Sequence, residues 1–378
     1  MPHPTAQQSR SSTPDATSQG TVVHFILDPR VGGPHNYIKA LHQGAAHFPR
    51  PCIVTAGHGP VTDVALFNLR HTWRPLYLLE VPLNILAILL FRLFGRLGRE
   101  HTVFHIHGAA NIAPLAAARI LGLPTLWHFH ETSGAPAAIV GLGKALLSPK
   151  KGRLASVADA AVRHFDLNDC TLLPPPVDTD FWHRTEPFEP TPVPEIVAVG
   201  NLNPLKGQDL LLHAMDDVPG PWHLHLMGSP LASHQAFSEK IHRLRGDLET
   251  RHPDCRVTLH GWASPETIRE RMARARLFVL PSRSEGCPIA LLEAMSMEQL
   301  CVATDVGDVT SILSRKNTGL IVPPEQPGAL SAAITSALDM SEAARRKMGA
   351  AARDHVISKH SMATIASKHS TMYASISN

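Results

Sequence analysis

The sequence predicts an α/β protein built from two Rossmann-like domains, and three observations support this fold class. Short, nearly continuous apolar runs alternate with alanine- and leucine-rich stretches of helical pattern, as they do in doubly wound parallel sheets. A proline-rich stretch at 174–195 separates two such series, because so many prolines fit neither helices nor central strands. The chain of 378 residues also has the length expected for two domains.

The composition excludes several classes of protein. Lys and Arg total 35 against 32 for Asp and Glu, which argues against a dedicated nucleic-acid-binding protein. Aromatic residues make up only 5% of the chain, so the core must be mainly aliphatic. The five cysteines are widely spaced and include no C-x-x-C pair. They predict neither a disulfide framework nor a structural zinc site, and they favour a cytoplasmic protein.

The first series of elements follows a polar stretch, residues 1–20, which lacks the apolar segment of a signal peptide and is predicted to be a disordered tail. A turn containing Gly32 and Gly33 comes directly after the first predicted strand and leads into a helical pattern, as at the start of a βαβ unit. The strands expected in this series are 21–28, 51–57, 102–108 and 124–130.

Segment 76–100 allows two interpretations. Its longest apolar run, 85–91, is too short to span a bilayer, which needs about 20 residues. It is either a helix that packs its aliphatic side on the first sheet with Arg92, Arg96 and Arg99 in solvent, or an interfacial helix whose arginines meet anionic lipid. The second interpretation would place the protein at the inner face of the membrane.

The second series begins after the proline-rich stretch, so we predict a first domain at 21–185 and a second at 186–357. The C-terminal segment, residues 341–378, is polar and alanine-rich and is expected to be helical. The strands expected in the second domain are 195–200, 222–228, 256–261, 277–282 and 301–306.

The strongest chemical signal lies at 281–296, where a predicted strand, a short loop and a helix follow one another. The loop and the first helical turn offer free backbone amides to a phosphate, and the positive end of the helix favours an anion. Glu285 and Glu293 flank this anion site, so they suit hydrogen bonds from hydroxyls of a sugar better than contact with phosphate. The amides expected to cradle the phosphate belong to Gly286, Cys287, Ile289 and Ala290.

A second signal lies at 199–215, where a strand ends at Gly200 and Lys206 stands at the start of the next helix. A lysine there is a point charge that can reach a diphosphate. Two other motifs are not interpreted as sites. Asp178-Thr-Asp180 has the form of a metal-binding pair but sits in the proline-rich stretch, and the glycines at 141–143 lack the spacing of a phosphate-binding loop, so no metal or ATP site is expected.

Histidines lie at the carboxyl ends of two predicted strands in the first domain. His130, and His107 as a second candidate, would face the crevice between the domains, where a histidine can bind sugar hydroxyls or a phosphate. We predict that His105 and His128 point to the opposite face of the sheet and are structural.

These pieces, taken in order from Thr21 on, resemble the retaining nucleotide-sugar glycosyltransferases of the GT-B fold, in particular glycosyltransferase family 4. The resemblance includes VGNLNPLKG at 199–207, LFVLPSRSEGCPIALLEAM at 277–295 and VATDVGD at 302–308. Glu285 and Glu293, which enclose seven residues, match the glutamate pair that marks the family.

The resemblance implies that the two domains face each other across a cleft, with the acceptor on the first, the nucleotide sugar on the second, and the helix at 358–378 crossing back to the first. Lys206 would hold the leaving diphosphate, Glu285 the donor sugar and Glu293 the ribose. His130 would lie near the donor sugar. Gly32 and Gly33 would approach the phosphates, and no cofactor or metal is expected. Two positions depart from the family pattern: Asn201 stands where an arginine is usual, and the loop at 306–311 lacks a glycine and a glutamate.

The expected activity is sugar transfer to a glycan or glycolipid acceptor in bacterial-type polysaccharide or glycolipid synthesis. Two alternatives remain at this point. A sugar-nucleotide epimerase of the same fold would convert the donor without an acceptor. A non-catalytic protein would bind nucleotide sugar but would not depend on Lys206 or Glu285.

Overall fold

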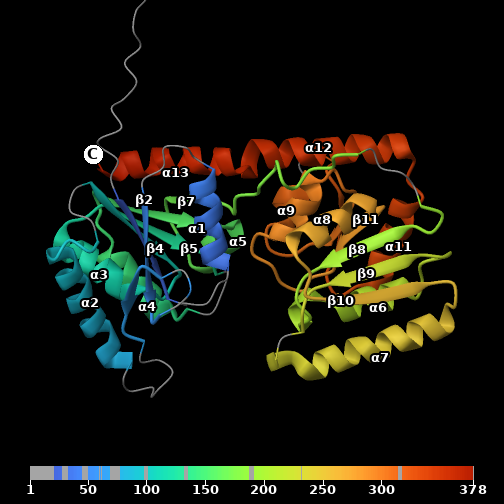
Figure 1. Cartoon of the computed structure of the whole chain (residues 1–378), viewed down its shortest axis with the longest axis horizontal. Helices are drawn as coiled ribbons and strands as arrows, with labels where there is room; N and C mark the ends of the chain where they lie inside the picture. The colour runs from blue at the N-terminus through green and yellow to red at the C-terminus, as the bar shows by residue number, and fades with distance from the viewer. Residues whose placement is uncertain are drawn as a thin grey trace, which may run out of the picture.

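The structure is a computed structural model of the chain. It describes residues 21–27, 33–44, 50–58, 60, 62–68, 77–97, 101–131, 135–186, 191–230, 232–313 and 317–377. The tail predicted at 1–20 and Gly32 lie outside the described residues. The described chain forms two lobes, each with a central sheet and helices on both faces, and two long helices run along both lobes (Figure 1).

The first lobe contains a seven-stranded sheet of order β3-β2-β1-β4-β5-β6-β7, in which every neighbouring pair is parallel. The strand order reverses between β1 and β4, and such a switch point is where doubly wound sheets bind ligands. The strands are β1 (Thr21–Ile26), β2 (Arg50–Ala56), β3 (Val64–Leu66), β4 (Thr102–His107), β5 (Thr125–Phe129), β6 (Gly152–Ser156) and β7 (Cys170–Leu172). The helices are α1 (Gly33–Gln43), α2 (Tyr77–Leu93), α3 (Ile112–Leu121), α4 (Ala137–Leu146) and α5 (Asp159–His164).

The second lobe contains a six-stranded parallel sheet of order β10-β9-β8-β11-β12-β13, with its switch point between β8 and β11. The strands are β8 (Glu195–Val199), β9 (His223–Met227), β10 (Arg256–Gly261), β11 (Leu277–Leu280), β12 (Cys301–Thr304) and β13 (Leu320–Val322). The helices are α6 (Gln208–Met215), α7 (Gln235–Arg251), α8 (Pro265–Arg274), α9 (Ile289–Ser296), α10 (Val309–Leu313) and α11 (Pro327–Leu338), with short 3-10 turns η2 (Pro204–Lys206) and η3 (Ala232–His234).

The end of the chain ties the two lobes together. Helix α12 (Glu342–His360) packs on α9 of the second lobe, and α13 (Met362–Ser377) packs on α1 of the first lobe (Figure 1). At the junction the backbone of Val177 donates to His360 O at 2.7 Å and accepts from Met362 N at 3.1 Å. The two-lobed α/β architecture is the predicted fold class. The exact domain boundaries stay predictions.

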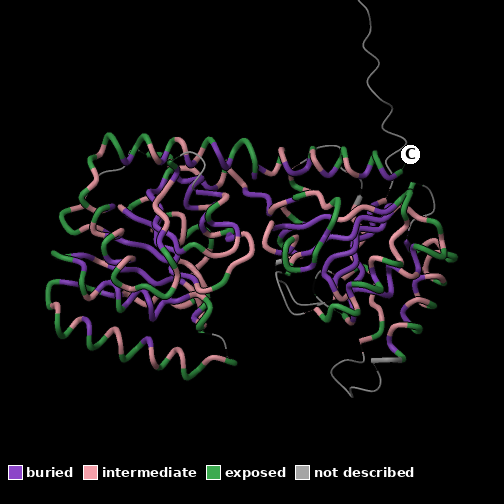
Figure 2. The backbone as a smooth tube through the Cα atoms, turned by 180° about the vertical axis from the view of Figure 1, so that it is seen from behind, coloured by how far each residue is buried: buried purple, intermediate pink, exposed green. Residues whose placement is uncertain are grey.

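Each sheet is buried between its helices, as the tube coloured by burial shows (Figure 2). The second core is mainly aliphatic, with residues such as Ile196, Leu224 and Val302 fully buried. The first core also holds aromatic rings, including Phe104 and Trp127. Since both strand faces are covered, the strands read as continuous apolar runs in the sequence.

Helix α2, which forms most of segment 76–100, has one buried side and one exposed side. Its buried side presents Glu80, Asn84 and Ile88 to the first lobe. Its other side exposes leucines at alternating spacings of four and three residues, which form one stripe along the helix. These exposed residues are Leu79, Leu83, Leu86, Leu90 and Leu93. Among the helices that the structure describes, none is long and apolar enough to cross a membrane.

Candidate functional site

Lys206 and Glu285 come together at the switch point of the second sheet. Lys206 ends the 3-10 turn that follows β8, and Glu285 lies in the loop that follows β11. The Lys206 ammonium contacts both carboxylate oxygens of Glu285, at 2.8 and 2.9 Å. Ser282 donates a further hydrogen bond to Glu285 Oε1 at 2.6 Å. The two residues that the sequence assigned to different parts of a donor therefore form an ion pair with each other.

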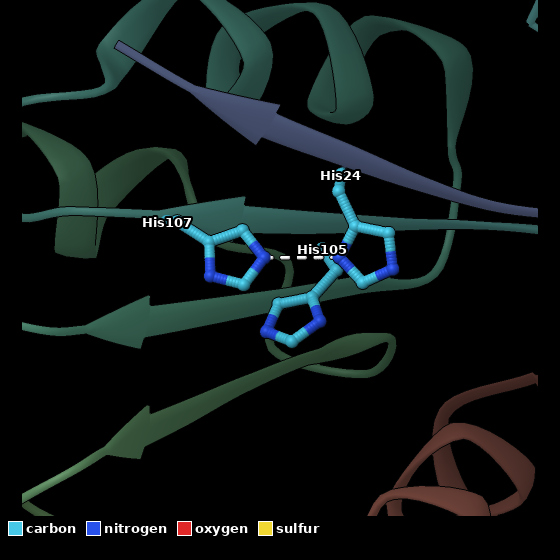
Figure 3. A group of neighbouring side chains, drawn as sticks. All are labelled: His24, His105 and His107. Atoms are coloured by element: carbon cyan, nitrogen blue, oxygen red, sulfur yellow. Dashed lines mark hydrogen bonds between the residues drawn. The ribbon is translucent and has the colours of Figure 1, made fainter. Parts of the chain in front are cut away.

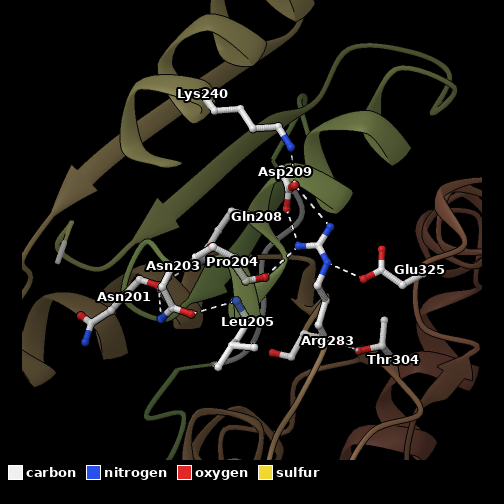
Figure 4. Close-up of polar contacts among 11 residues, drawn as sticks. Asn201, Asn203, Pro204, Leu205, Gln208, Asp209, Lys240, Arg283, Thr304 and Glu325 are labelled. Atoms are coloured by element: carbon white, nitrogen blue, oxygen red, sulfur yellow. Dashed lines mark hydrogen bonds and ion pairs between the residues drawn. The ribbon is translucent and has the colours of Figure 1, made fainter. Parts of the chain in front are cut away.

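Arg283 fixes the loop that carries Lys206 (Figure 4). Its backbone N–H donates to Leu205 O at 2.8 Å, and its guanidinium donates to Pro204 O at 2.8 Å. The same guanidinium forms ion pairs with the buried Asp209, at 2.7 Å, and with Glu325.

These ion pairs shift the pKa values of both partners. Hydrogen bonds to the two carboxylates raise the pKa of Arg283. Burial alone would raise the pKa of Asp209, but hydrogen bonds from Arg283 and Lys240 lower it. Arg283 is a positioning residue that the motif analysis did not single out.

Two glycines allow the loop that carries Glu285 to lie directly against the loops after β8 and β12. Gly207 has φ 64°, and a Cβ there would stand 2.0 Å from Pro281 O. Gly307 has φ 59°, and a Cβ there would stand 2.3 Å from Glu285 O. Both positions need the left-handed backbone and the missing side chain of glycine. The loops after β8, β11 and β12 can therefore pack directly on one another.

The predicted anion cradle has the required free donors. Helix α9 starts at Ile289, and no acceptor among the described residues receives the amides of Gly286, Cys287, Ile289 or Ala290. The carboxyl of Glu293, one turn into α9, has no hydrogen bond or ion pair with the described residues, and burial raises its pKa to about 8. A buried carboxyl without a protein partner is available to a ligand hydroxyl: when ionised it accepts a hydrogen bond from the hydroxyl, and when protonated it can also donate one to it.

The structure also places the other residues that were predicted on the donor side. Asn201 is exposed, and its backbone carbonyl accepts hydrogen bonds from Gln208 Nε2 at 3.0 Å and from Asn203 Nδ2 at 3.3 Å. Gly33 is the first residue of α1, which opens at the switch point of the first sheet. Asp308, in the loop that departs from the family pattern, contacts the first lobe: its carboxylate accepts the amides of Asp159 at 2.9 Å and Ala160 at 3.1 Å.

His130 and His107 do lie at the carboxyl ends of β5 and β4, and they share a hydrogen bond of 2.8 Å. Burial, with the charge of His369 as a further cause, lowers the pKa of His130 to about 3, so its ring is neutral. The prediction that His105 and His128 point to the opposite face is wrong. Residues two apart in a strand share a face, and the rings of His105 and His107 stack with centroids 4.0 Å apart.

The histidines form a cluster on the side of the first sheet that α1 and α13 cover. Figure 3 shows His24 of β1 beside His105 and His107 of β4. The ring of Tyr37 in α1 meets His130 edge-on at 5.1 Å, and the thiol of Cys287 packs against the same buried group of the first lobe. Tyr37 therefore belongs both to the ring contacts of the histidines and to the apolar cluster that Cys287 packs against. The sequence showed these histidines singly and gave no sign that they gather.

A cavity of about 650 Å³ lies between the lobes beside the loop that carries Glu285. Cys287 and Asp308 line it from the second lobe, Asp159 and Leu172 line it from the first, and His360 lines it from the end of α12. Its size is typical of small-molecule sites. The structure thus brings together Lys206, Glu285 and the free amides, and places His130 on the lobe that faces them.

The second lobe matches a known family. Residues 181–355 match the family model "Glycosyl transferases group 1". A D-inositol 3-phosphate glycosyltransferase of Jonesia denitrificans is 29% identical over 50% of this chain and 45% of its own. An α-D-kanosaminyltransferase of Streptomyces kanamyceticus is 33% identical over 32% and 31% of the two chains. The chain spans less than half of the length of each of these curated relatives.

Solved structures match nearly the whole chain. A glycosyltransferase from Rickettsia africae has a TM-score of 0.79 at 16% identity, covering 95% of this chain and 99% of its own. The HepE protein of Anabaena in complex with UDP has a TM-score of 0.77 at 15% identity, covering 94% and 100%. The chain has the two-lobed GT-B fold. Together with the family match, this supports a glycosyltransferase of that fold.

Proposed function

We propose that the protein is a retaining glycosyltransferase that moves a hexosyl group from a nucleoside-diphosphate sugar to a hydroxyl of a glycan or glycolipid. The observation that carries this proposal is the meeting of Lys206, Glu285 and four free amides at the switch point of the second sheet. A cation beside free helix amides fits a diphosphate, and carboxylates beside it fit sugar hydroxyls.

In this proposal the positive groups bind the diphosphate, and the carboxylates bind the hydroxyls of the donor. As the bond from the anomeric carbon to the diphosphate breaks, negative charge grows on the departing phosphate oxygen, where Lys206 and the α9 amides stabilise it. The acceptor oxygen bonds to the same carbon, and its proton passes to that phosphate oxygen. Glu285 orients the sugar hydroxyls and Glu293 those of the ribose. Because Lys206 and the amides supply the positive charge, we propose that the transfer needs no metal ion at the diphosphate.

A donor screen with a lysine variant tests the proposal. UDP and UDP-sugars come first, since the similar HepE protein was solved with UDP. Saturation with a ligand at 100 times its dissociation constant should add about 2.7 kcal/mol to the free energy of unfolding. Lys206→Ala should slow transfer by about 100-fold or more, as the loss of one charge-stabilising donor does. Lys347→Ala, on the exposed side of α12, is the matched control.

The same assay separates the alternatives. An epimerase would change the donor sugar in the absence of any acceptor, while a transferase releases the diphosphate only as the acceptor is glycosylated. A binding protein without catalysis would shift in melting temperature with UDP but release no product. No shift with any nucleoside diphosphate would count against the donor site itself.

We propose a glycolipid or membrane-bound glycan as acceptor class, reached from the membrane surface through α2. The exposed leucine stripe and the exposed Arg96 beside it suit an anionic lipid surface. None of the five cysteines forms a disulfide with another described residue, which suits a reducing compartment at the inner face of the membrane. Synthesis of polysaccharide or glycolipid is the process that this combination fits.

A further inference from the structure

Seven histidine rings gather between the first sheet and helices α1 and α13. They divide into two groups by hydrogen bonding. His24, His42, His107 and His130 form one chain, with nitrogen distances of 3.0 Å from His42 to His24, 3.0 Å from His24 to His107 and 2.8 Å from His107 to His130. Both ring nitrogens of His24 and of His107 take part in this series of hydrogen bonds, and Figure 3 draws the central bond between the two rings. Neither of these two histidines therefore has a free lone pair for a metal ion.

The second group, His105, His128 and His369, is not satisfied in this way. His369 Nδ1 lies 2.9 Å from Ile365 O, and a carbonyl only accepts, so Nδ1 carries the proton and Nε2 holds a lone pair. Among the described residues, Nε2 has one candidate hydrogen-bond partner, the Tyr37 hydroxyl oxygen at 3.3 Å. That hydroxyl donates to Leu173 O at 3.0 Å, so its proton is already committed.

His128 and His105 approach each other through ring nitrogens that can face one ion: His128 Nδ1 lies 3.1 Å from His105 Nε2. His369 Nε2 lies on a third ring of the same group, and its lone pair receives no proton from the Tyr37 hydroxyl. A buried polar atom left without a partner costs about 1–3 kcal/mol, so this lone pair points to a missing ligand.

The spacing of the three rings suits a metal ion. The ring centroids of His105, His128 and His369 are 5.3, 5.7 and 6.0 Å apart, and one nitrogen of each lies within 4.8 Å of the others. Imidazole nitrogens bind Zn²⁺ at about 2.0–2.1 Å, which for tetrahedral geometry puts ring centres roughly 5–5.5 Å apart. Small rotations of the rings therefore bring all three nitrogens to one ion.

We propose that His105, His128 and His369 form a zinc site that fastens the C-terminal helix α13 to strands β4 and β5 of the first lobe. Neutral imidazoles with no carboxylate among them select Zn²⁺ over Mg²⁺ or Ca²⁺. The nitrogens that face away from the ion have the oxygen partners typical of zinc ligands: His105 Nδ1 lies 2.8 Å from the Tyr373 hydroxyl, and His369 Nδ1 donates to Ile365 O.

The role of the ion follows from the surroundings. The ligands come from positions 105, 128 and 369, so one ion joins segments that are far apart in the chain. The site is separate from Lys206 and Glu285, which lie on the second lobe, and the role is structural.

The experiment is a metal analysis of the full chain purified without a polyhistidine tag. After growth with added zinc and dialysis, mass spectrometry of the metal content should find one Zn²⁺ per chain. Apo protein refilled with Co²⁺ should show the strong visible absorption of a tetrahedral site. Removal of the metal by a chelator should lower the unfolding temperature, since an ion bound only by the folded state stabilises it.

Matched variants locate the site. His369→Gln and His128→Gln should lose the metal, while His24→Gln, in the satisfied chain, and His213→Gln, exposed on α6, should keep it. Wild-type protein that stays free of metal and shows no cobalt spectrum would overturn the proposal, whatever the variants do. Equal metal content in His369→Gln and His24→Gln would overturn it as well. Neither result bears on donor binding, which the UDP shift measures separately.

Discussion

Glu285 and Lys206 hold each other in the ligand-free site, so a donor has to divide an existing ion pair. Glu285 is nearly buried, with 8% of its side chain exposed, and also accepts the Ser282 hydroxyl. Its carboxylate therefore repels the phosphate that Lys206 attracts. Binding of the sugar by Glu285 and binding of the diphosphate by Lys206 are coupled through this pair.

We expect Glu285→Gln to separate binding from turnover. Loss of the carboxylate frees Lys206 and removes a like charge, so nucleoside diphosphate should bind up to roughly fivefold more tightly, which corresponds to the free energy of a partly exposed ion pair. Transfer should slow at least about tenfold because a sugar contact is lost. Calorimetry with UDP and a transfer assay measure the two effects. Glu239→Gln, on the exposed surface of α7, should change neither.

Glu293 should make the ligand-free protein less stable as the pH rises. Burial raises the pKa of its carboxyl to about 8 from the ordinary value of 4.5. The folded state thus keeps a proton that the unfolded chain releases, and the stabilisation is complete below the unfolded pKa and lost as the pH rises through the folded one. Unfolding temperatures measured between about pH 5 and pH 9 should fall with pH less steeply for Glu293→Gln than for the wild type. Parallel curves would contradict the raised pKa.

At the scale of elements, the sequence predicted the strands that are continuous apolar runs. It missed β3, β7 and β13, which have three residues each, and β6, whose sequence Gly-Arg-Leu-Ala-Ser has no such run. Pairing with neighbours, and not local composition, makes these segments strands. The fold class was still correct because the long central strands define the topology.

The same distinction divides the candidate site. Lys206 and Glu285 were predictable because each belongs to a local strand, loop and helix pattern. The role of Arg283 was not, since its partners Asp209 and Glu325 are far away in the sequence. The histidine cluster was missed for the same reason, and the two-residue period of a strand was also applied with the wrong parity. Contacts between distant segments decide both features.

Arg283→Met should loosen the loop that carries Lys206. The variant loses the hydrogen bond to Pro204 O and the ion pairs to Asp209 and Glu325, while Asp209 keeps Lys240 at 2.7 Å. We expect a loss of about 1–3 kcal/mol of stability and faster amide exchange over 203–207. Exchange followed by mass spectrometry checks this. Arg346→Met, which removes an exposed pair on α12, should leave that segment unchanged.

The leucine stripe of α2 should control binding to lipid without affecting the fold. Leu86 and Leu90 are 54% and 41% exposed, so replacing both with Glu removes few internal contacts. The double variant should lose cosedimentation with vesicles rich in anionic phospholipid and keep the wild-type unfolding temperature. Leu142→Glu, at a 53% exposed position of α4 in the same lobe, should bind vesicles normally. Equal sedimentation of both variants would show that α2 is not the contact.

At the scale of the whole molecule, two contacts between the lobes lie close to the donor site. Asp308 of the second lobe accepts the first two amides of α5 in the first lobe, as an N-cap residue of the same chain segment normally does. Cys287 packs against the buried apolar cluster of the first lobe that includes Tyr37. Both contacts stand next to the Glu285 loop, so closure of the lobes and the shape of the donor site depend on the same residues.

Asp308→Ala should open the lobes. The two α5 amides lose their acceptor, and the loss of such an N-cap acceptor costs about 0.5–2 kcal/mol of stability. The Asp308 carboxylate forms no ion pair with the described residues, so the substitution breaks no salt bridge there. We expect small-angle scattering to give a larger radius of gyration for the ligand-free variant than for the wild type. The transfer rate should be lower, while the same nucleotide sugar is used as donor. Asp308→Asn, whose amide oxygen still accepts one bond, should fall between the two. If the variant and the wild type scatter identically, the two amide bonds do not hold the lobes closed, and the apolar contact of Cys287 and the α12–α13 connection must do so instead.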